Sequence, residues 1–172
     1  MKRIIVIGCP GAGKSTLARK LRDTLRLPLF YCDVLFFNSD KTNVSRDEFD
    51  KSILNITETN EWIVDGNYLR TMPIRLEKCD TVFFLDYPTE LCLENAAKRI
   101  GTKREDLPWI ENDFDEDFKQ YIKDFAKDQL PKIYSLLSQH SDKNIYVFHN
   151  PSECDDFVNL YLQSALGNKA DK

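Results

Sequence analysis

The feature that most constrains this chain is a glycine-rich stretch near its start. Residues 8–15 read Gly-Cys-Pro-Gly-Ala-Gly-Lys-Ser and match the pattern G-x-x-x-x-G-K-[ST] in full. A loop that wraps its backbone N–H groups around phosphate oxygens needs dihedral angles that side chains obstruct, which explains the glycines. The stretch follows a short apolar run and opens a helical pattern, the context in which this motif binds phosphates. We therefore expect a P-loop that binds ATP with Mg²⁺.

Each part of this motif has an expected role. The Lys14 ammonium is expected to reach the β- and γ-phosphates, which makes it a catalytic as well as a binding residue, and the Ser15 hydroxyl is expected to ligate Mg²⁺. The helix that begins at Lys14 would direct its positive end at the same phosphates. The full set of expected nucleotide-binding residues is Gly8, Cys9, Pro10, Gly11, Ala12, Gly13, Lys14, Ser15 and Thr16.

Composition restricts the size and the setting of the fold. The chain has 172 residues, 42% of them apolar, which suits one well-buried core, so we expect a single domain over residues 1–172. A net charge of −4 argues against direct binding to duplex DNA. The apolar run Ile4–Ile7 is too short for a signal peptide, and no run approaches a membrane span. The five cysteines are dispersed, which indicates reduced thiols, so the cytoplasm is the expected compartment. The sequence does not indicate the oligomeric state.

Apolar runs alternate with helical patterns along the chain. Continuous apolar runs are typical of strands that are buried on both faces of a parallel sheet, and they occur at Ile4–Ile7, Leu29–Tyr31, Trp62–Val64, Val82–Leu85 and Ile145–Phe148. Helical patterns occupy Lys14–Arg26, a stretch opened by Ser45, Thr89–Arg99, a kinked stretch from Phe114 to Leu137, and a last helix near Ser152. This alternation predicts an α/β fold, a three-layer, doubly wound, five-stranded parallel sheet.

Size and missing motifs narrow the class of P-loop protein. The chain has no D-x-x-G and no N/T-K-x-D guanine-reading motif, and it has no room for the additional strands of larger ATPases. The stretch from Glu61 to Thr71 resembles the D-G-F-P-R-T segment of adenylate kinases, with one additional residue before the arginine, and Cys79–Pro88 resembles the strand that follows. Small kinases are therefore favoured.

At closer range the chain resembles a bacterial family called "DNA topology modulation protein", which consists of adenylate kinase-like P-loop proteins. The stretches that carry the resemblance are Gly8–Arg19, Leu29–Asp33, Trp62–Arg75, Asp80–Pro88, Arg99–Asp106 and Phe125–Tyr134. The resemblance implies an adenylate or shikimate kinase-like P-loop NTPase fold with a short helical lid at about residues 100–117 and an acceptor-binding region at about residues 34–60. It implies transfer of the γ-phosphoryl group of ATP to a nucleotide, a nucleoside or a small hydroxyl metabolite.

Two aspartates are candidates for the acidic magnesium residue. Asp65 ends an apolar run, where it would hold Mg²⁺ through water, and the adenylate kinase resemblance favours it. Asp86 also ends an apolar run and is the rival. A simple turn or helix-capping role for Asp65, before Gly66, is the structural alternative.

A third aspartate is expected to lie near the acceptor. Asp33 follows the second strand, at the carboxyl edge where ligands of open α/β sheets bind. A carboxylate there would accept a proton from a substrate hydroxyl, as in shikimate kinase-like enzymes, or hold a magnesium-bound water. The alternative is an ordinary surface turn.

Basic residues gather around Gly101 and after Asp65. Arg99 and Arg104 are the candidates for lid arginines that neutralise the transferring phosphoryl group, because a guanidinium binds phosphate with two parallel bonds. The alternative is a solvated helix end. The residues expected to bind the acceptor, together with Asp33, are Asn67, Tyr68, Arg70 and Arg75.

Two functions rank above a third, an ATPase switch that moves a partner, for which no arginine finger or partner surface can be read. The first is the kinase just described. The second is a nucleotide-binding regulator, without turnover or with weak hydrolysis, that is linked indirectly to DNA topology, as the family name suggests.

Overall fold

The computed structural model describes the backbone of residues 1–167 and the side chains of residues 1–161. The last five positions of the predicted domain therefore lie outside the described residues. Within the described part of the chain, no helix combines the length and the apolar character that crossing a membrane requires.

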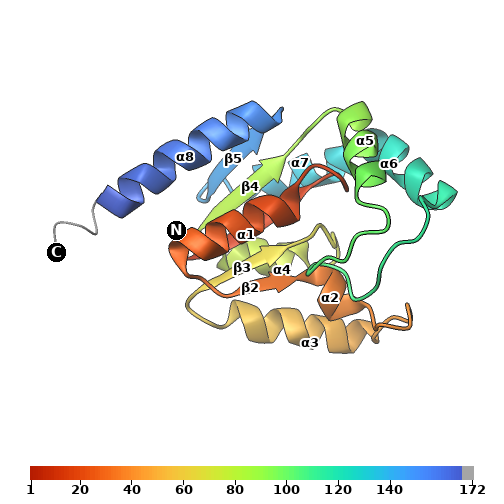
Figure 1. The fold of residues 1–172 in the computed structure, drawn as a ribbon. Coiled ribbons are helices and arrows are strands. Elements are labelled where there is room, and N and C mark those ends of the chain that lie inside the picture. The colour runs from red at the N-terminus through yellow and green to blue at the C-terminus, as the bar shows by residue number, and fades with distance from the viewer. Residues whose placement is uncertain (168–172) are drawn as a thin grey trace.

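The centre of the molecule is a five-stranded parallel sheet, as the sequence predicts (Figure 1). Its spatial order is β2-β3-β1-β4-β5, so the first strand lies in the middle and the chain is wound outward from it in both directions. In such sheets ligands bind beyond the carboxyl ends of the strands where the winding reverses, and here that point is the end of β1. The strands are β1 (Arg3–Gly8), β2 (Leu29–Tyr31), β3 (Trp62–Asp65), β4 (Thr81–Leu85) and β5 (Asn144–Phe148).

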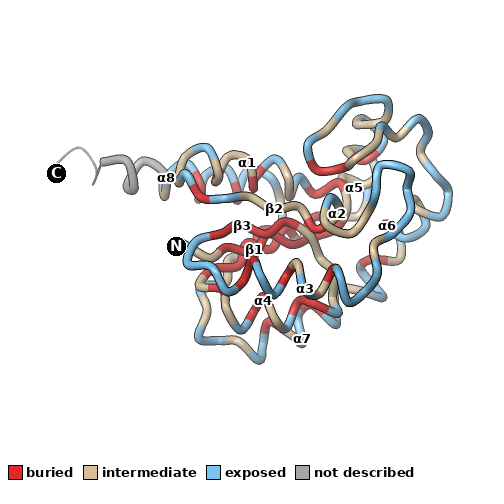
Figure 2. Tube along the Cα trace, turned by 90° about the horizontal axis from the view of Figure 1, so that it is seen from below, coloured by how far each residue is buried: buried red, intermediate tan, exposed pale blue. Residues whose placement is uncertain are grey.

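Helices cover both faces of this sheet, and Figure 2 shows the three layers edge-on. One face carries α1 and α8, and the other carries α3, α4 and α7. The strands β1, β3 and β4 are almost entirely buried between these layers, which explains why they are apolar without alternation. The helices are α1 (Lys14–Leu25), α2 (Cys32–Phe36), α3 (Arg46–Thr57), α4 (Met72–Lys78), α5 (Thr89–Lys98), α6 (Glu116–Asp128), α7 (Leu130–Ser138) and α8 (Pro151–Gly167).

Several helix boundaries follow from local chemistry. The Ser45 hydroxyl caps α3 by accepting a hydrogen bond from the Glu48 amide. Gly101, just beyond α5, adopts a φ of 76°, a left-handed conformation that glycine favours. The kink expected near Pro131 is present as the break between α6 and α7, which begins at Leu130.

Two short helices and one loop differ from the sequence-based expectation. The helices α2 and α4 are too short to produce a periodic apolar pattern, and the sequence did not indicate them. The predicted lid contains no helix between Gly101 and Asp115 and is instead an irregular loop. This lid loop runs from α5 to α2 and returns to α6 (Figure 1). Its many polar and charged residues make contacts with neighbouring elements rather than forming a helix of their own.

Candidate functional site

The P-loop has the conformation that its sequence predicts. Gly11 and Gly13 adopt φ angles of 88° and 91°, which residues with a side chain rarely reach. A Cβ atom on Gly11 would lie 2.0 Å from the carbonyl oxygen of Cys92, so the loop approaches α5 too closely for any larger residue. The Lys14 ammonium donates to the Cys9 carbonyl at 3.1 Å and so folds over its own loop.

Two asparagines hold the P-loop in place from outside. The Asn67 amide pairs with the backbone of Gly8, accepting from its N–H at 3.0 Å and donating to its C=O at 2.9 Å. Asn95 of α5 donates to the Gly11 carbonyl at 3.1 Å. The Asn67 side chain, expected to contact the acceptor, is therefore engaged with the P-loop, and Asn95 is a second supporting residue that sequence reasoning missed.

The structure brings Ser15 and Asp65 together and leaves Asp86 elsewhere. The Ser15 hydroxyl lies 2.6 Å from Asp65 Oδ2, whereas Asp65 Oδ1 is buried without a hydrogen-bond partner among the described residues. A hydroxyl and a buried carboxylate oxygen that needs a partner are the ligand types that Mg²⁺ prefers, so these residues fit the metal. Asp86 accepts a hydrogen bond from the Tyr134 hydroxyl at 2.6 Å and lines neither cavity of the site.

Burial raises the pKa of Asp65 to about 6 in the metal-free protein, with Lys14 and Ser15 opposing the shift. The carboxyl group of the unfolded chain keeps its usual pKa of about 4. The folded protein therefore holds this proton more tightly, and its stability falls as the pH rises from about 4 to about 6, by about 2 to 3 kcal/mol.

We accordingly expect Asp65→Asn to stabilise the metal-free protein at pH 7 by about 2 kcal/mol and to abolish the stabilisation that Mg·ATP confers. Urea unfolding at pH 4.5 and pH 7, with and without Mg·ATP, measures both effects. The gain should shrink to less than about 1 kcal/mol at pH 4.5, where Asp65 of the folded wild-type protein is protonated. Asp86→Asn is the matched control, and an equal response of the two variants would contradict the assignment.

Asp33 lies in a partly buried position next to the hydroxyl of Tyr68. The Tyr68 hydroxyl donates to Asp33 Oδ1 at 2.8 Å. Burial raises the pKa of Asp33, and the hydrogen bond from Tyr68 opposes that rise. The ordinary surface turn is thus wrong for Asp33: its carboxylate lies at the start of α2 and faces the same cavity as Ser15 and Asp65.

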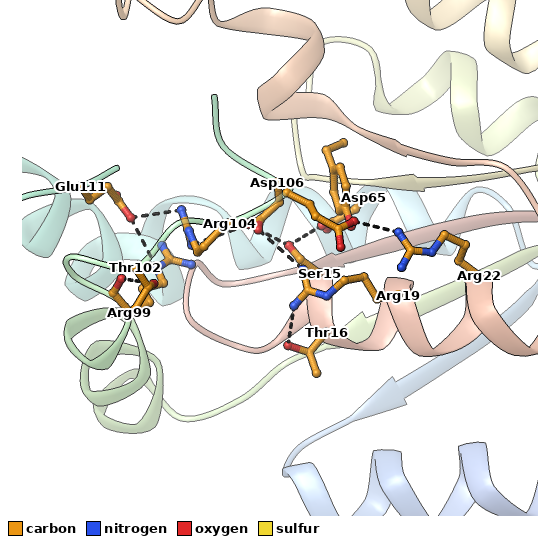
Figure 3. Close-up of polar contacts among 12 residues, drawn as sticks. Ser15, Thr16, Arg19, Arg22, Asp65, Arg99, Thr102, Arg104, Asp106 and Glu111 are labelled. Carbon is orange, nitrogen blue, oxygen red and sulfur yellow. Dashed lines mark hydrogen bonds and ion pairs between the residues drawn. The ribbon is translucent and has the colours of Figure 1, made fainter. Parts of the chain in front are cut away.

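The two predicted lid arginines lie close together and both approach Glu111 (Figure 3). Glu111 is 3.1 Å from Arg104 and 3.8 Å from Arg99. Arg99 Nε is buried and has no hydrogen-bond partner within the described part of the chain. Burial, and next the nearby Arg104, lower the pKa of Arg99. A pair of arginines with a donor still unsatisfied is suited to receive a phosphate group.

Asp106 and Arg19 join this cluster, and sequence reasoning assigned neither of them. Asp106, in the lid loop, accepts from the Ser15 hydroxyl at 3.1 Å and forms ion pairs with Arg104 at 3.6 Å and Arg19 at 3.7 Å (Figure 3). Arg19 also donates to the Thr16 hydroxyl at 3.3 Å. Both residues are the last positions of stretches that carry the family resemblance, a signal that pointed to them without giving a role.

The two predicted acceptor arginines lie outside the site. Arg75 is fully buried, and its guanidinium donates to the backbone carbonyls of Gly66, Asn67 and Tyr68, at 2.7 Å for Gly66. Arg70 is paired with Asp50 on α3 and lines neither cavity. The expected clamp on an anionic acceptor is therefore not assembled. The Arg75 guanidinium binds the carbonyls that turn the chain after β3, and the Arg70 guanidinium binds a partly buried carboxylate on α3.

We expect Arg75→Met to destabilise the protein by about 3 kcal/mol, because several buried carbonyls lose their donors. Arg70→Met, which removes a partly exposed ion pair, is the matched control and should cost about 1 kcal/mol. Urea unfolding measures both values. Equal losses would show that the buried bonds of Arg75 contribute nothing beyond those of a surface pair.

Two cavities meet at the P-loop. The smaller has a volume of about 310 Å³ and is lined by P-loop and α1 residues together with Asn95. The larger has a volume of about 710 Å³ and extends past Asp33, Asp65 and Tyr68 toward the lid loop. Five residues line both cavities and therefore mark their junction: Lys14, Ser15, Arg99, Arg104 and Asp106.

Comparisons with known proteins agree with this architecture. A shikimate kinase from Acinetobacter baumannii, solved in complex with shikimate, superposes with a TM-score of 0.61 over 98% of this chain and 95% of that one, at 17% identity. The fold is that of P-loop kinases of the shikimate kinase and adenylate kinase type. An identity this low establishes the fold alone.

Sequence relatives belong to the same group of kinases. A shikimate kinase from Rhodococcus jostii is 31% identical over 114 residues, which cover 58% of this chain and 66% of that enzyme, just under two thirds. An adenylate kinase isoenzyme 6 homolog from Plasmodium falciparum is 26% identical over 86% of this chain and 93% of that protein. No family model matches the chain. These relatives support a P-loop kinase, and they do not confirm the narrower topology modulation family.

Proposed function

We propose that this protein is an ATP- and Mg²⁺-dependent kinase that transfers the γ-phosphoryl group of ATP to a hydroxyl group of a small molecule. The observation that carries the proposal is the junction of the two cavities at Lys14, Ser15, Arg99, Arg104 and Asp106. A protein that only binds a nucleotide needs one cavity, whereas transfer between two molecules needs two that meet where the phosphoryl group passes.

The roles of the residues follow from their positions. The P-loop amides and Lys14 would hold the phosphates of ATP, and Ser15 and Asp65 would hold Mg²⁺, which neutralises phosphate charge when bound. Arg99 and Arg104 would stabilise the charge on the transferring group. Asp33, on the acceptor side, would take the proton from the attacking hydroxyl. The lid is proposed to be the loop Gly101–Asp115, and the compartment to be the reducing cytoplasm, since all five cysteines are buried free thiols.

Calorimetry with Mg·ATP and a coupled assay for ADP across a panel of hydroxyl-bearing metabolites test this proposal. We expect binding of Mg·ATP, acceptor-dependent release of ADP, and loss of both with Lys14→Ala. Lys20→Ala, on the same helix but outside both cavities, is the control. Binding of Mg·ATP without ADP release for any acceptor would favour the regulator instead. If calorimetry detects no heat of binding for Mg·ATP, both functions are excluded.

A further inference from the structure

The larger cavity has an aromatic end that the kinase proposal does not use. Phe36, Phe37, Tyr68 and Trp109 all line it, and we call these four residues the aromatic chamber. Ring centroids are 5.0 Å apart for Phe36 and Phe37, 5.3 Å for Phe36 and Tyr68, and 5.3 Å for Phe37 and Trp109. The chamber thus joins α2, the loop after β3 and the lid loop into one apolar wall.

This wall is positioned next to the proposed catalytic base. Tyr68 contributes its ring to the chamber and its hydroxyl to Asp33, at 2.8 Å. A ligand that packs a flat ring against the chamber would therefore have its other end within the reach of Asp33. Aromatic walls favour planar rings, which stack or pack edge-on against them. The amides of Asn112 and Gln129 also line the cavity and offer donors and acceptors to the polar edge of such a ring.

The charges of the cavity disfavour an anionic ligand at this end. Three of the cations that line it, Lys14, Arg99 and Arg104, also line the smaller cavity and belong to its phosphate side. Among the described residues, Lys41 is the one other cation of the lining, and its ammonium lies 5.9 Å from the centre of the Trp109 ring. Six carboxylates line the same cavity. Asp106 and Glu111 form ion pairs with Arg104, and the other four are Asp33, Asp65, Asp113 and Asp115.

The arginines that would bind a phosphate or carboxylate of the acceptor are engaged elsewhere. Arg75 is fully buried among carbonyls, and Arg70 is paired with Asp50 outside the cavity. Lys14 and Arg104 are the cations that act on Asp33, and the kinase proposal assigns both of them to the phosphates of ATP. An acceptor that brought its own negative charge to Asp33 would meet a partly buried carboxylate with no further cation of its own to pair with, which is unfavourable.

We propose that the acceptor is an uncharged nucleoside-type alcohol, whose planar ring packs in the aromatic chamber and whose hydroxyl contacts Asp33. This inference rests on the proposed kinase function and names its substrate class. The hydroxyl oxygen forms a bond to the γ-phosphorus of ATP, the bond from that phosphorus to the bridging oxygen of ADP breaks, and the hydroxyl proton passes to Asp33. The products are a nucleoside monophosphate and ADP.

Transfer of radiolabelled γ-phosphate from ATP to the common ribo- and deoxyribonucleosides, to their monophosphates and to shikimate tests the substrate class. We expect at least one nucleoside to be phosphorylated with a kcat/KM about 100-fold above that of its monophosphate, because the monophosphate adds an uncompensated charge. Preferred transfer to a monophosphate or to shikimate overturns the nucleoside assignment and leaves the kinase function standing. Mg·ATP binding without transfer to any nucleoside also overturns it.

Two variants test the chamber itself with the nucleoside that is turned over best. Trp109→Ala should raise the KM for the nucleoside about tenfold while leaving the KM for ATP within about twofold. Ile110→Ala is the matched control, since Ile110 is the next residue of the same loop, is 43% exposed and lines neither cavity. Arg70→Met should also leave both KM values unchanged. Equal effects of the Trp109 and Ile110 variants on the KM for the nucleoside would overturn the assignment. A raised KM for the nucleoside with Arg70→Met would also overturn it.

Discussion

Replacing Asp33 with asparagine is expected to lower kcat by about 10²- to 10⁴-fold, the range for loss of a general base, while the affinity for Mg·ATP stays within about twofold. Asparagine keeps the size of the side chain and an oxygen that accepts the Tyr68 hydrogen bond, so the cavity wall should persist. The variant loses only the ability to take a proton. Single-turnover kinetics with saturating acceptor, together with calorimetry for Mg·ATP, measure the two quantities separately.

The control for this variant comes from the same edge of the sheet. Asp86 follows β4 and accepts a hydrogen bond from a tyrosine hydroxyl at 2.6 Å, and Asp33, after β2, also accepts one from a tyrosine. Unlike Asp33, Asp86 lines neither cavity. Asp86→Asn should therefore leave kcat unchanged. A small and equal effect of both substitutions would mean that the acceptor hydroxyl does not lie at Asp33.

The pH dependence of turnover provides a second test of Asp33 as the general base. Burial raises the pKa of Asp33, the charge of Asp106 adds to this, and Tyr68, Lys14 and Arg104 oppose it. A general base must be deprotonated to act, so activity should fall as the pH drops through this raised pKa. The fall should therefore begin at a higher pH than it would for an ordinary aspartate. Tyr68→Phe removes a hydrogen bond that stabilises the carboxylate and should move the acid limb to higher pH. An unmoved acid limb would assign it to another group.

Arg104→Ala is expected to lower kcat by about 10³-fold or more. This is the usual effect of removing an arginine that neutralises a transferring phosphoryl group. Arg104 lines both cavities, is 15% exposed in its side chain, and lies between Glu111 and Asp106 of its own loop. Its charge is therefore held at the junction where negative charge develops during transfer. Rapid-quench measurement of the chemical step separates this effect from lid opening or product release.

Lys103→Ala is the matched control for this variant. Lys103 precedes Arg104 in the lid loop, carries the same charge, and lines neither cavity. Its removal should change kcat by less than about twofold, because an exposed charge is screened by solvent. Comparable losses from both substitutions would indicate that the loop acts through its overall positive charge and not through one positioned guanidinium.

Asp106 has a consequence for both variants, because it connects the lid to the P-loop. In the structure its carboxylate contacts the Ser15 hydroxyl and the Arg104 guanidinium. Both partners are groups that the kinase proposal assigns to Mg·ATP. A bound nucleotide must therefore compete with Asp106 for them.

Local sequence patterns determined much of the fold of this protein. The apolar runs predicted all five strands, and the helical spacing predicted α1, α3, α5, α6, α7 and α8. These features are local. A strand that is buried on both faces has a continuous apolar run, and a helix that is buried on one face has apolar residues three to four positions apart, so both patterns are visible over a few residues. The conformation of the P-loop was equally readable, since Gly11 and Gly13 adopt angles that few other residues reach.

Only the tertiary structure decided which polar residues share a site. Ser15 meets Asp65 across 50 positions of sequence and Asp106 across 91, and no local pattern carries such pairings. The same applies to the arginines: Arg70 and Arg75 look alike in sequence, yet one pairs with Asp50 at the surface and the other is fully buried among carbonyls. The sequence determines which backbone segments form, whereas the packing of distant segments determines which charges are left to meet a ligand.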